Sequence, residues 1–207
     1  NQTACPPGTF NPDTASTFSN DCRSAIEGFY VDELLGPGQI NQTKCPSGTY
    51  NPNEGATLIS QCILSDPGYY SNSTSGIPIN QKSCEKGTYQ PEAGQASCLI
   101  SDVGYYVENY SSIEQTPCPE GTYQPLRGQI DCLFADPGYY VGQTGQSEPT
   151  PCPEGTYSDR PAMSECLEAG LGHYVEDSDR TARIQCPVNT YTVVTNNSTG
   201  TTWNSVS

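Results

Sequence analysis

Residues 118–140 read CPEGTYQPLRGQIDCLFADPGYY, and this stretch decides the fold. It contains Cys-Pro-x-Gly-Thr-Tyr, a loop, a second Cys, five residues and Gly-Tyr-Tyr. The same frame recurs from Cys5 to Cys186, with five complete copies and the start of a sixth. A fixed period of this size is typical of a repeat architecture. Thirteen of the fourteen tyrosines follow the frame, and Tyr110 is the exception.

The period divides the chain into six segments. We predict repeat 1 with a leader at 1–44, repeats 2 to 5 at 45–83, 84–117, 118–151 and 152–185, and an incomplete repeat 6 with a Thr/Ser/Asn-rich tail at 186–207. The interval from the second Cys to Gly-Tyr-Tyr is constant, while the loops vary in length. Constant segments are typical of structured parts, and variable ones of surface loops.

The composition excludes a single large core. Only 33% of the 207 residues are hydrophobic, whereas Gly and Pro number 20 and 18. Repeats this short bury too little surface to fold without a covalent or metal staple. The eleven regularly spaced cysteines therefore predict disulfides and an oxidising, extracellular or cell-surface location.

The expected fold is small, disulfide-rich and mostly β or irregular, an elongated linear array of about five cysteine-rich repeat units. Each turn glycine is expected to take a positive φ, as in Asp66-Pro67-Gly68 and Asp136-Pro137-Gly138, and Asn189 replaces it in the last copy. No segment has helical periodicity. We expect loops that are uniformly polar.

The tyrosines are interpreted as a structural aromatic frame that takes the place of an aliphatic core. An aromatic strip that binds sugar or peptide is the alternative. Besides Tyr30, the frame comprises Tyr50, Tyr69, Tyr70, Tyr89, Tyr105, Tyr106, Tyr123, Tyr139, Tyr140, Tyr157, Tyr174 and Tyr191.

Spacing alone leaves two disulfide schemes open. Pairing across the first loop leaves Cys186 without a partner, and pairing across the second loop leaves Cys5 without one. A partner for Cys186 would fall near residue 200 or 203, where Gly200 and Trp203 stand. We expect either a longer array that continues beyond Ser207 or an intermolecular bridge at Cys186.

The repeated Cys-Pro-x-Gly-Thr-Tyr with a Cys about 14 residues later resembles the ephrin-receptor-like cysteine-rich repeats. It is also similar to the first half of a tumour-necrosis-factor-receptor-type (EGF-like) repeat. The resemblance implies the first scheme: Cys5–Cys22, Cys45–Cys62, Cys84–Cys98, Cys118–Cys132 and Cys152–Cys166, with Cys186 unpaired or intermolecular. The chain departs from these families in its second half-unit. Ser65, Ser101 and Ala135 stand near the position where a second cysteine pair would begin, so only one bridge per unit remains.

Six sequons predict N-linked glycans, at Asn1, Asn41, Asn72, Asn109, Asn196 and Asn197. The first four lie in the return loops or the equivalent leader, and none lies between the paired cysteines of a complete unit. One edge of the array is therefore expected to carry sugar. The Thr/Ser/Asn-rich tail is a candidate for O-linked sugar.

The charge of −15 opposes binding to nucleic acid or anionic membranes. We expect no enzyme and no cofactor, because the single His173 occupies a tyrosine slot of the frame. Weak calcium binding by Glu33, Asp66, Asp102 and Asp136 is a minor alternative. The expected role is an extracellular structural protein forming a rod, stalk, surface appendage or fibril, whose partners are copies of itself or continuing repeats. The alternative is a receptor or adhesin ectodomain that binds another extracellular protein.

Overall fold

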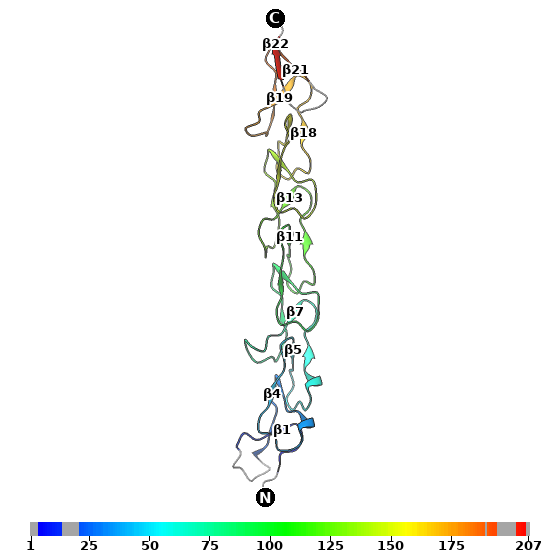
Figure 1. The fold of residues 1–207 in the computed structure, drawn as a ribbon, viewed down its shortest axis with the longest axis vertical. Coiled ribbons are helices and arrows are strands. Elements are labelled where there is room, and N and C mark those ends of the chain that lie inside the picture. The colour runs from blue at the N-terminus through cyan, green and yellow to red at the C-terminus, as the bar shows by residue number, and fades with distance from the viewer. Residues whose placement is uncertain (1–3, 14–20, 189, 194–201, 206–207) are drawn as a thin grey trace. The chain divides into compact units, whose positions relative to one another are not determined.

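The computed structural model describes residues 4–13, 21–188, 190–193 and 202–205 (Figure 1). Within these ranges the fold is small, disulfide-rich and mostly β, as predicted. The strands form eleven separate two-stranded antiparallel sheets, and none of the described segments is an α-helix. Each sheet is a β-hairpin, in which one loop joins two short strands.

The hairpins fall into two alternating kinds. One kind, the A half-unit, starts at the first cysteine of each repeat. Its hairpins are β1–β2 (Thr9–Phe10, Arg23–Ser24), β5–β6 (Thr49–Tyr50, Ile63–Leu64), β9–β10 (Thr88–Tyr89, Leu99–Ile100), β13–β14 (Thr122–Tyr123, Leu133–Phe134) and β17–β18 (Thr156–Tyr157, Leu167–Glu168). The hairpin β21–β22 (Thr190–Val193, Thr202–Ser205) follows Cys186 in the same way.

The other kind, the B half-unit, starts at Ala25, Ser65, Ser101, Ala135 or Ala169. Its hairpins are β3–β4 (Phe29–Tyr30, Thr43–Lys44), β7–β8 (Tyr69–Tyr70, Lys82–Ser83), β11–β12 (Tyr105–Tyr106, Thr116–Pro117), β15–β16 (Tyr139–Tyr140, Thr150–Pro151) and β19–β20 (His173–Val175, Arg183–Gln185). Two short 3-10 turns, η2 (Glu33–Leu35) and η3 (Ile59–Gln61), lie in loops of the first two repeats.

The Gly-Thr pair of the motif builds the turn that starts each A hairpin. Gly48 has a φ of 87°, in the left-handed region that glycine tolerates. The backbone N–H of Thr49 donates to the carbonyl of Pro46 at 3.0 Å, and its hydroxyl donates to the same oxygen at 2.8 Å. Positive φ at Gly68 and Gly138 confirms the predicted turns, at 80° and 87°. Asn189 lies outside the described residues.

Within each compact unit that the chain forms, backbone hydrogen bonds link successive half-units. The N–H of Gly48 donates to the carbonyl of Ser71 at 2.7 Å, and its carbonyl accepts from the N–H of Ser65 at 2.9 Å. Gly121 repeats both bonds, with Val141 and Ala135 as its partners. Since the turn glycine lies against neighbouring backbone, a Cβ at Gly48 would collide with the carbonyl of Gly94. Stacking is thus built into the motif.

Small residues, rather than aromatic rings, occupy the interior. The first residue of each complete half-unit is buried, as at Cys45, Ser65, Cys118 and Ala135, and so is the third residue after most turn glycines. The buried members of that second set are Val31, Asn51, Ser71, Gln90, Val107, Gln124, Val141, Ser158 and Val175. The interior is therefore narrow, as suits units of this length.

The tyrosine frame borders this interior and does not fill it. The frame residues lie on the first strands of the hairpins, and their rings are half-buried where the structure describes them. Tyr30 is buried, whereas Tyr139 is exposed. The side chain of Tyr191 lies outside the described residues. A ring at the boundary keeps its hydroxyl in water while its face shields the column of small residues.

The chain divides into two compact units. One comprises Asn1–Ile100 with Asn109–Glu114, and the other comprises Ser101–Glu108 with Gln115–Ser207. The segment Asn109–Glu114 belongs to the first unit because its backbone bonds there. The N–H of Ser111 donates to the carbonyl of Cys84 at 2.9 Å, and the carbonyl of Ser112 accepts from the N–H of Gln90 at the same distance.

Candidate functional site

Disulfides close the loop of each complete A half-unit. They join Cys5 to Cys22, Cys45 to Cys62, Cys84 to Cys98, Cys118 to Cys132 and Cys152 to Cys166. The Cα atoms of each pair are 5.6–5.8 Å apart, within the usual range. Of the two schemes that spacing left open, the structure has the first. In these short hairpins the disulfide holds together strands of two residues each.

Cys186 carries a free, half-buried thiol. Its N–H donates to the carbonyl of Gly172 at 2.9 Å, as the other first cysteines bond the preceding turn glycine. In complete A half-units the closing cysteine directly precedes the second strand of the hairpin, as Cys22 precedes Arg23 at the start of β2. The pairing of Tyr191 with Asn204 puts Trp203 at that position. Of the two positions that loop lengths suggested, strand register selects 203.

In three B half-units a glutamine stands where an A half-unit has its closing cysteine. Gln81 precedes β8, as Cys62 precedes β6. Its Oε1 accepts from the N–H of Asp66 at 2.6 Å, and its Nε2 donates to Oδ2 of that carboxylate at 2.7 Å. Gln115 makes the same two bonds to Asp102, at 2.7 and 3.3 Å. We call this arrangement the glutamine clamp.

The clamp varies among the other B half-units. Gln42 accepts from the N–H of Ile26 at 2.9 Å. Arg183 takes the position in the last B half-unit, where its guanidinium lies 3.4 Å from the carbonyl oxygen of Ala169. Pro149 takes it in the fourth repeat, and its ring offers no such donor. Sequence reasoning missed the clamp, although an alignment of A half-units with B half-units puts these glutamines opposite cysteines.

A second position that recurs in the loops also binds the neighbouring half-unit. Its residue has positive φ, and its N–H donates to the first residue of the half-unit before. Gly94 donates to the carbonyl of Ser65 at 2.8 Å, and Gly145 donates to that of Cys118 at 2.8 Å. Ser111 and Ala162 occupy this position with φ of 54° and 62°. They are two of the three described residues other than glycine that have positive φ, and the third is Arg180.

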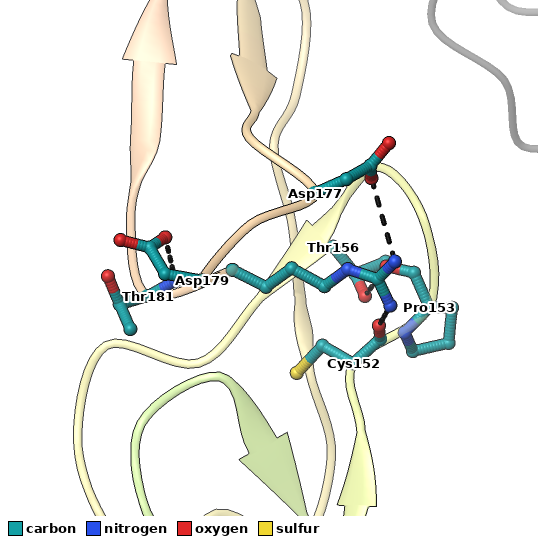
Figure 2. A network of polar contacts seen from close by, with 7 residues as sticks. Cys152, Pro153, Thr156, Asp177, Asp179 and Thr181 are labelled. Carbon is teal, nitrogen blue, oxygen red and sulfur yellow. Dashed lines mark hydrogen bonds and ion pairs between the residues drawn. The ribbon is translucent and has the colours of Figure 1, made fainter.

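Arg180 makes the same link through its side chain (Figure 2). Its guanidinium donates to the carbonyl of Cys152 and lies 3.6 Å from the carboxylate of Asp177. Its backbone carbonyl accepts from the N–H of Ser158 at 3.0 Å. The Nε atom is buried and has no hydrogen-bond partner among the described residues. At Arg180 the side chain therefore donates the hydrogen bond to the preceding half-unit that a backbone N–H donates at the other loop positions.

The outer strands of the two kinds of hairpin differ in chemistry. The A edge, which we define as the second strands β6, β10 and β14, consists of apolar residues. They are Ile63, Leu64, Leu99, Ile100, Leu133 and Phe134, and each is 46 to 65% exposed. The B edge, which we define as the second strands β4, β8, β12 and β16, is polar or prolyl. It consists of Thr43, Lys44, Lys82, Ser83, Thr116, Pro117, Thr150 and Pro151.

Three sequons lie within the described residues, and all three belong to loops of B half-units. Asn41 and Asn109 are exposed, and Asn72 is half-buried. Oδ1 of Asn72 accepts from the N–H and the hydroxyl of Thr74, at 2.9 and 2.5 Å. The positions Asn1, Asn196 and Asn197 lie outside the described residues. The described sequons are therefore placed in the half-units that carry the polar edge.

The first B loop does not follow the expectation of uniformly polar loops, which is wrong here. Leu34 and Leu35, on η2, are 82% and 69% exposed. The side chain of Asp32 caps this turn by accepting from the N–H of Leu34 at 3.0 Å.

Tyr110, the tyrosine outside the frame, is exposed. The ammonium of Lys86 lies over its ring, with Nζ 5.8 Å from the ring centre.

The ionisable residues singled out from the sequence are dispersed. His173 lies on β19, half-buried, with Nδ1 3.1 Å from the carbonyl oxygen of Leu171. Asp66 and Asp102 hold clamp glutamines, and Asp102 also pairs with Arg127 at 3.1 Å. Across the described ranges, His, Cys, Asp and Glu nowhere form a group of three or more that could hold a metal ion. The same ranges contain no helix long and apolar enough to cross a membrane.

No family model matches this chain, and no curated protein matches it either.

Proposed function

We propose that this protein is an extracellular structural array, a glycosylated rod that serves as a stalk, surface appendage or fibril. The observation that carries the proposal is the repeated backbone ladder. The same pair of bonds at the turn glycine recurs in both compact units, at Gly48 and at Gly121. In arrays where each unit contacts mainly its neighbours, length increases with copy number.

The five disulfides support an extracellular location, since such bonds persist in oxidising compartments. Glycans on the B half-units, at Asn41, Asn72 and Asn109, belong to the same proposal. So does kinship with ephrin-receptor-like or tumour-necrosis-factor-receptor-like repeats, which the first-loop disulfides support. The array is proposed to act without catalysis or a cofactor, and its partners are continuing repeats or further copies.

A receptor or adhesin role is the second candidate, and one observation favours it. Leu34 and Leu35 give the first repeat a protruding apolar turn. Exposed apolar groups of this kind mark contact sites for proteins. Replacement of both by serine, with Leu126→Ser as a control at another exposed leucine, tests this role in a cell-binding assay. Loss of binding in the double variant alone would favour the receptor role over the structural one.

The structural proposal is tested by changing the number of repeats. Deletion of residues 118–151 removes one A and one B half-unit and joins Pro117 to Cys152, a junction of the same kind as Pro117 to Cys118. The maximum dimension from small-angle scattering is expected to fall by a fixed step, with four disulfides retained. Duplication of the same segment should add an equal step.

A deletion of residues 118–134 serves as the control. It removes one A half-unit alone and joins two B half-units, so the alternation is broken and the step should not be reproduced. An unchanged maximum dimension after removal of the whole repeat would overturn the structural proposal.

A further inference from the structure

Within each compact unit, the A edge and the B edge differ in chemistry. The A edge combines exposed apolar side chains with the absence of charge from the strands β6, β10 and β14. The B edge carries Lys44 and Lys82, and its half-units carry the three described sequons. Neither the lysines nor a glycan would tolerate close burial against a second molecule.

The two sides are kept apart by the way the loops stack. Loops of A half-units pack on the A half-unit of the previous repeat, as the contact between Gly94 and Leu64 shows. Loops of B half-units pack in the same manner, as between Gly145 and the ring of Tyr105. Lys44 likewise bonds the carbonyls of Ser73 and Gly76, in the next B loop. The apolar strands therefore repeat on one column of hairpins and the polar strands on the other, within each compact unit.

We propose that the apolar strands of the A edge, taken within each compact unit, are docking surfaces for a second copy of this chain. The spacing of its apolar pairs carries the choice of occupant. In the first compact unit the pair Ile63–Leu64 is followed by the pair Leu99–Ile100 one repeat later. A partner that meets every pair must have the same period, and another copy of the array has it.

Charge supports the same occupant. Two copies at −15 each repel one another wherever their acidic surfaces meet. The strands β6, β10 and β14 carry no charged residue, so contact through them brings no like charges of these strands together. Each pair is too small for stable binding by itself, but several linked pairs act together and raise the overall affinity. Association is therefore expected to strengthen with salt, which screens the remaining repulsion.

The inference rests on the proposed structural role, and it names the partner of the array. Sedimentation velocity of residues 1–207 in a Cys186→Ser background, which removes the free thiol, measures association over a range of concentrations. The variant Leu64→Ser/Ile100→Ser/Phe134→Ser is expected to raise the dissociation constant at least tenfold. The matched control Ile40→Ser/Ile77→Ser/Ile113→Ser removes side chains that are 50 to 54% exposed in B loops, and it should associate like the parent.

Intact mass confirms that each variant keeps five disulfides. Amide exchange on the parent chain provides a test without an apolar substitution. Residues 63–64 and 99–100 should gain protection as the concentration rises, whereas residues 43–44 and 82–83 should not. A parent chain that stays monomeric up to its solubility limit, or a control as weakened as the A-edge variant, would overturn the docking surface. In that case the change in maximum dimension on deletion or duplication of residues 118–151 would still support the structural role. Failure of the docking surface and failure of the structural role are therefore distinguishable.

Discussion

The amide of Gln81 contacts Asp66 twice, through the backbone N–H at 2.6 Å and the carboxylate at 2.7 Å. This contact closes the B loop at the position where Cys45 and Cys62 close the A loop before it. In the second and third repeats, covalent and hydrogen-bonded closures of the same kind of hairpin thus alternate. Because no disulfide closes the B loops, we expect substitutions at the clamp to change the local stability of a B half-unit without changing that of the A half-unit before it.

Gln81→Ala removes both bonds of the clamp. Each net hydrogen bond contributes about 0.5–1.5 kcal/mol, so we expect a loss near the lower end of about 1–3 kcal/mol because the contacts are exposed. Amide exchange should rise in residues 66–82 and remain unchanged in the disulfide loop 45–62. Gln143→Ala, at an exposed glutamine in another B loop, is the control. Equal exchange in the two variants would contradict the clamp.

A pair of cysteines at Ser65 and Gln81 should form a sixth disulfide. Ser65 corresponds to Cys45 and Gln81 to Cys62, with a separation of 16 residues that falls between those of the native pairs. Closure of a loop of about 15 residues contributes about 3 kcal/mol in the chain-entropy description. Intact mass and thiol titration should find one free thiol, that of Cys186. Three free thiols in the folded variant would contradict the equivalence of the two half-units.

Much of this arrangement follows from sequence spacing, and some of it does not. The interval from Cys132 to Gly138 and the constant Gly-Tyr-Tyr predict the hairpins and turns, because backbone conformation at glycine is a local property. The clamp depends on which side chain reaches across a loop, which spacing does not reveal. The buried positions of Asn51 and Gln90 were missed for a related reason: both residues are polar, and their backbones bond the half-units before and after their own.

Ala162→Gly should stabilise the protein. Ala162 has a φ of 62° at the loop position where Gly94 and Gly128 have 72° and 73°. A residue with a Cβ loses about 1–2 kcal/mol in this region, and the extra freedom of glycine in the unfolded chain returns about 0.5–1 kcal/mol of that. Denaturant unfolding should therefore show a gain of about 0.5–1 kcal/mol. Gly128→Ala should show the reverse change, and a loss of stability on Ala162→Gly would refute the assignment.

Gly104→Ala should destabilise more than any loop glycine substitution. Its φ is 80°, and a Cβ there would collide with the carbonyl of Gly145 in the next B loop. Gly55→Ala separates the two effects, since Gly55 has a φ of 75° but no atom within 4 Å of the added Cβ. We expect about 1 kcal/mol for Gly55→Ala and at least twice that for Gly104→Ala. Similar values for both, in thermal unfolding, would argue against close stacking.

Single-molecule stretching of the oxidised chain tests the central claim most directly, namely that disulfides close the A loops whereas the B loops between them have no covalent closure. Under tension the B loops should open in several small steps, while the residues between paired cysteines stay closed. Reductant should then release the disulfide loops. Each loop with a separation of 14 residues should add about 40–45 Å, which is its extended length at 3.3–3.6 Å per residue less the 5.7–5.8 Å already spanned by the bonded cysteines. A single all-or-none extension of the oxidised chain, or an extended length unaffected by reductant, would contradict the account.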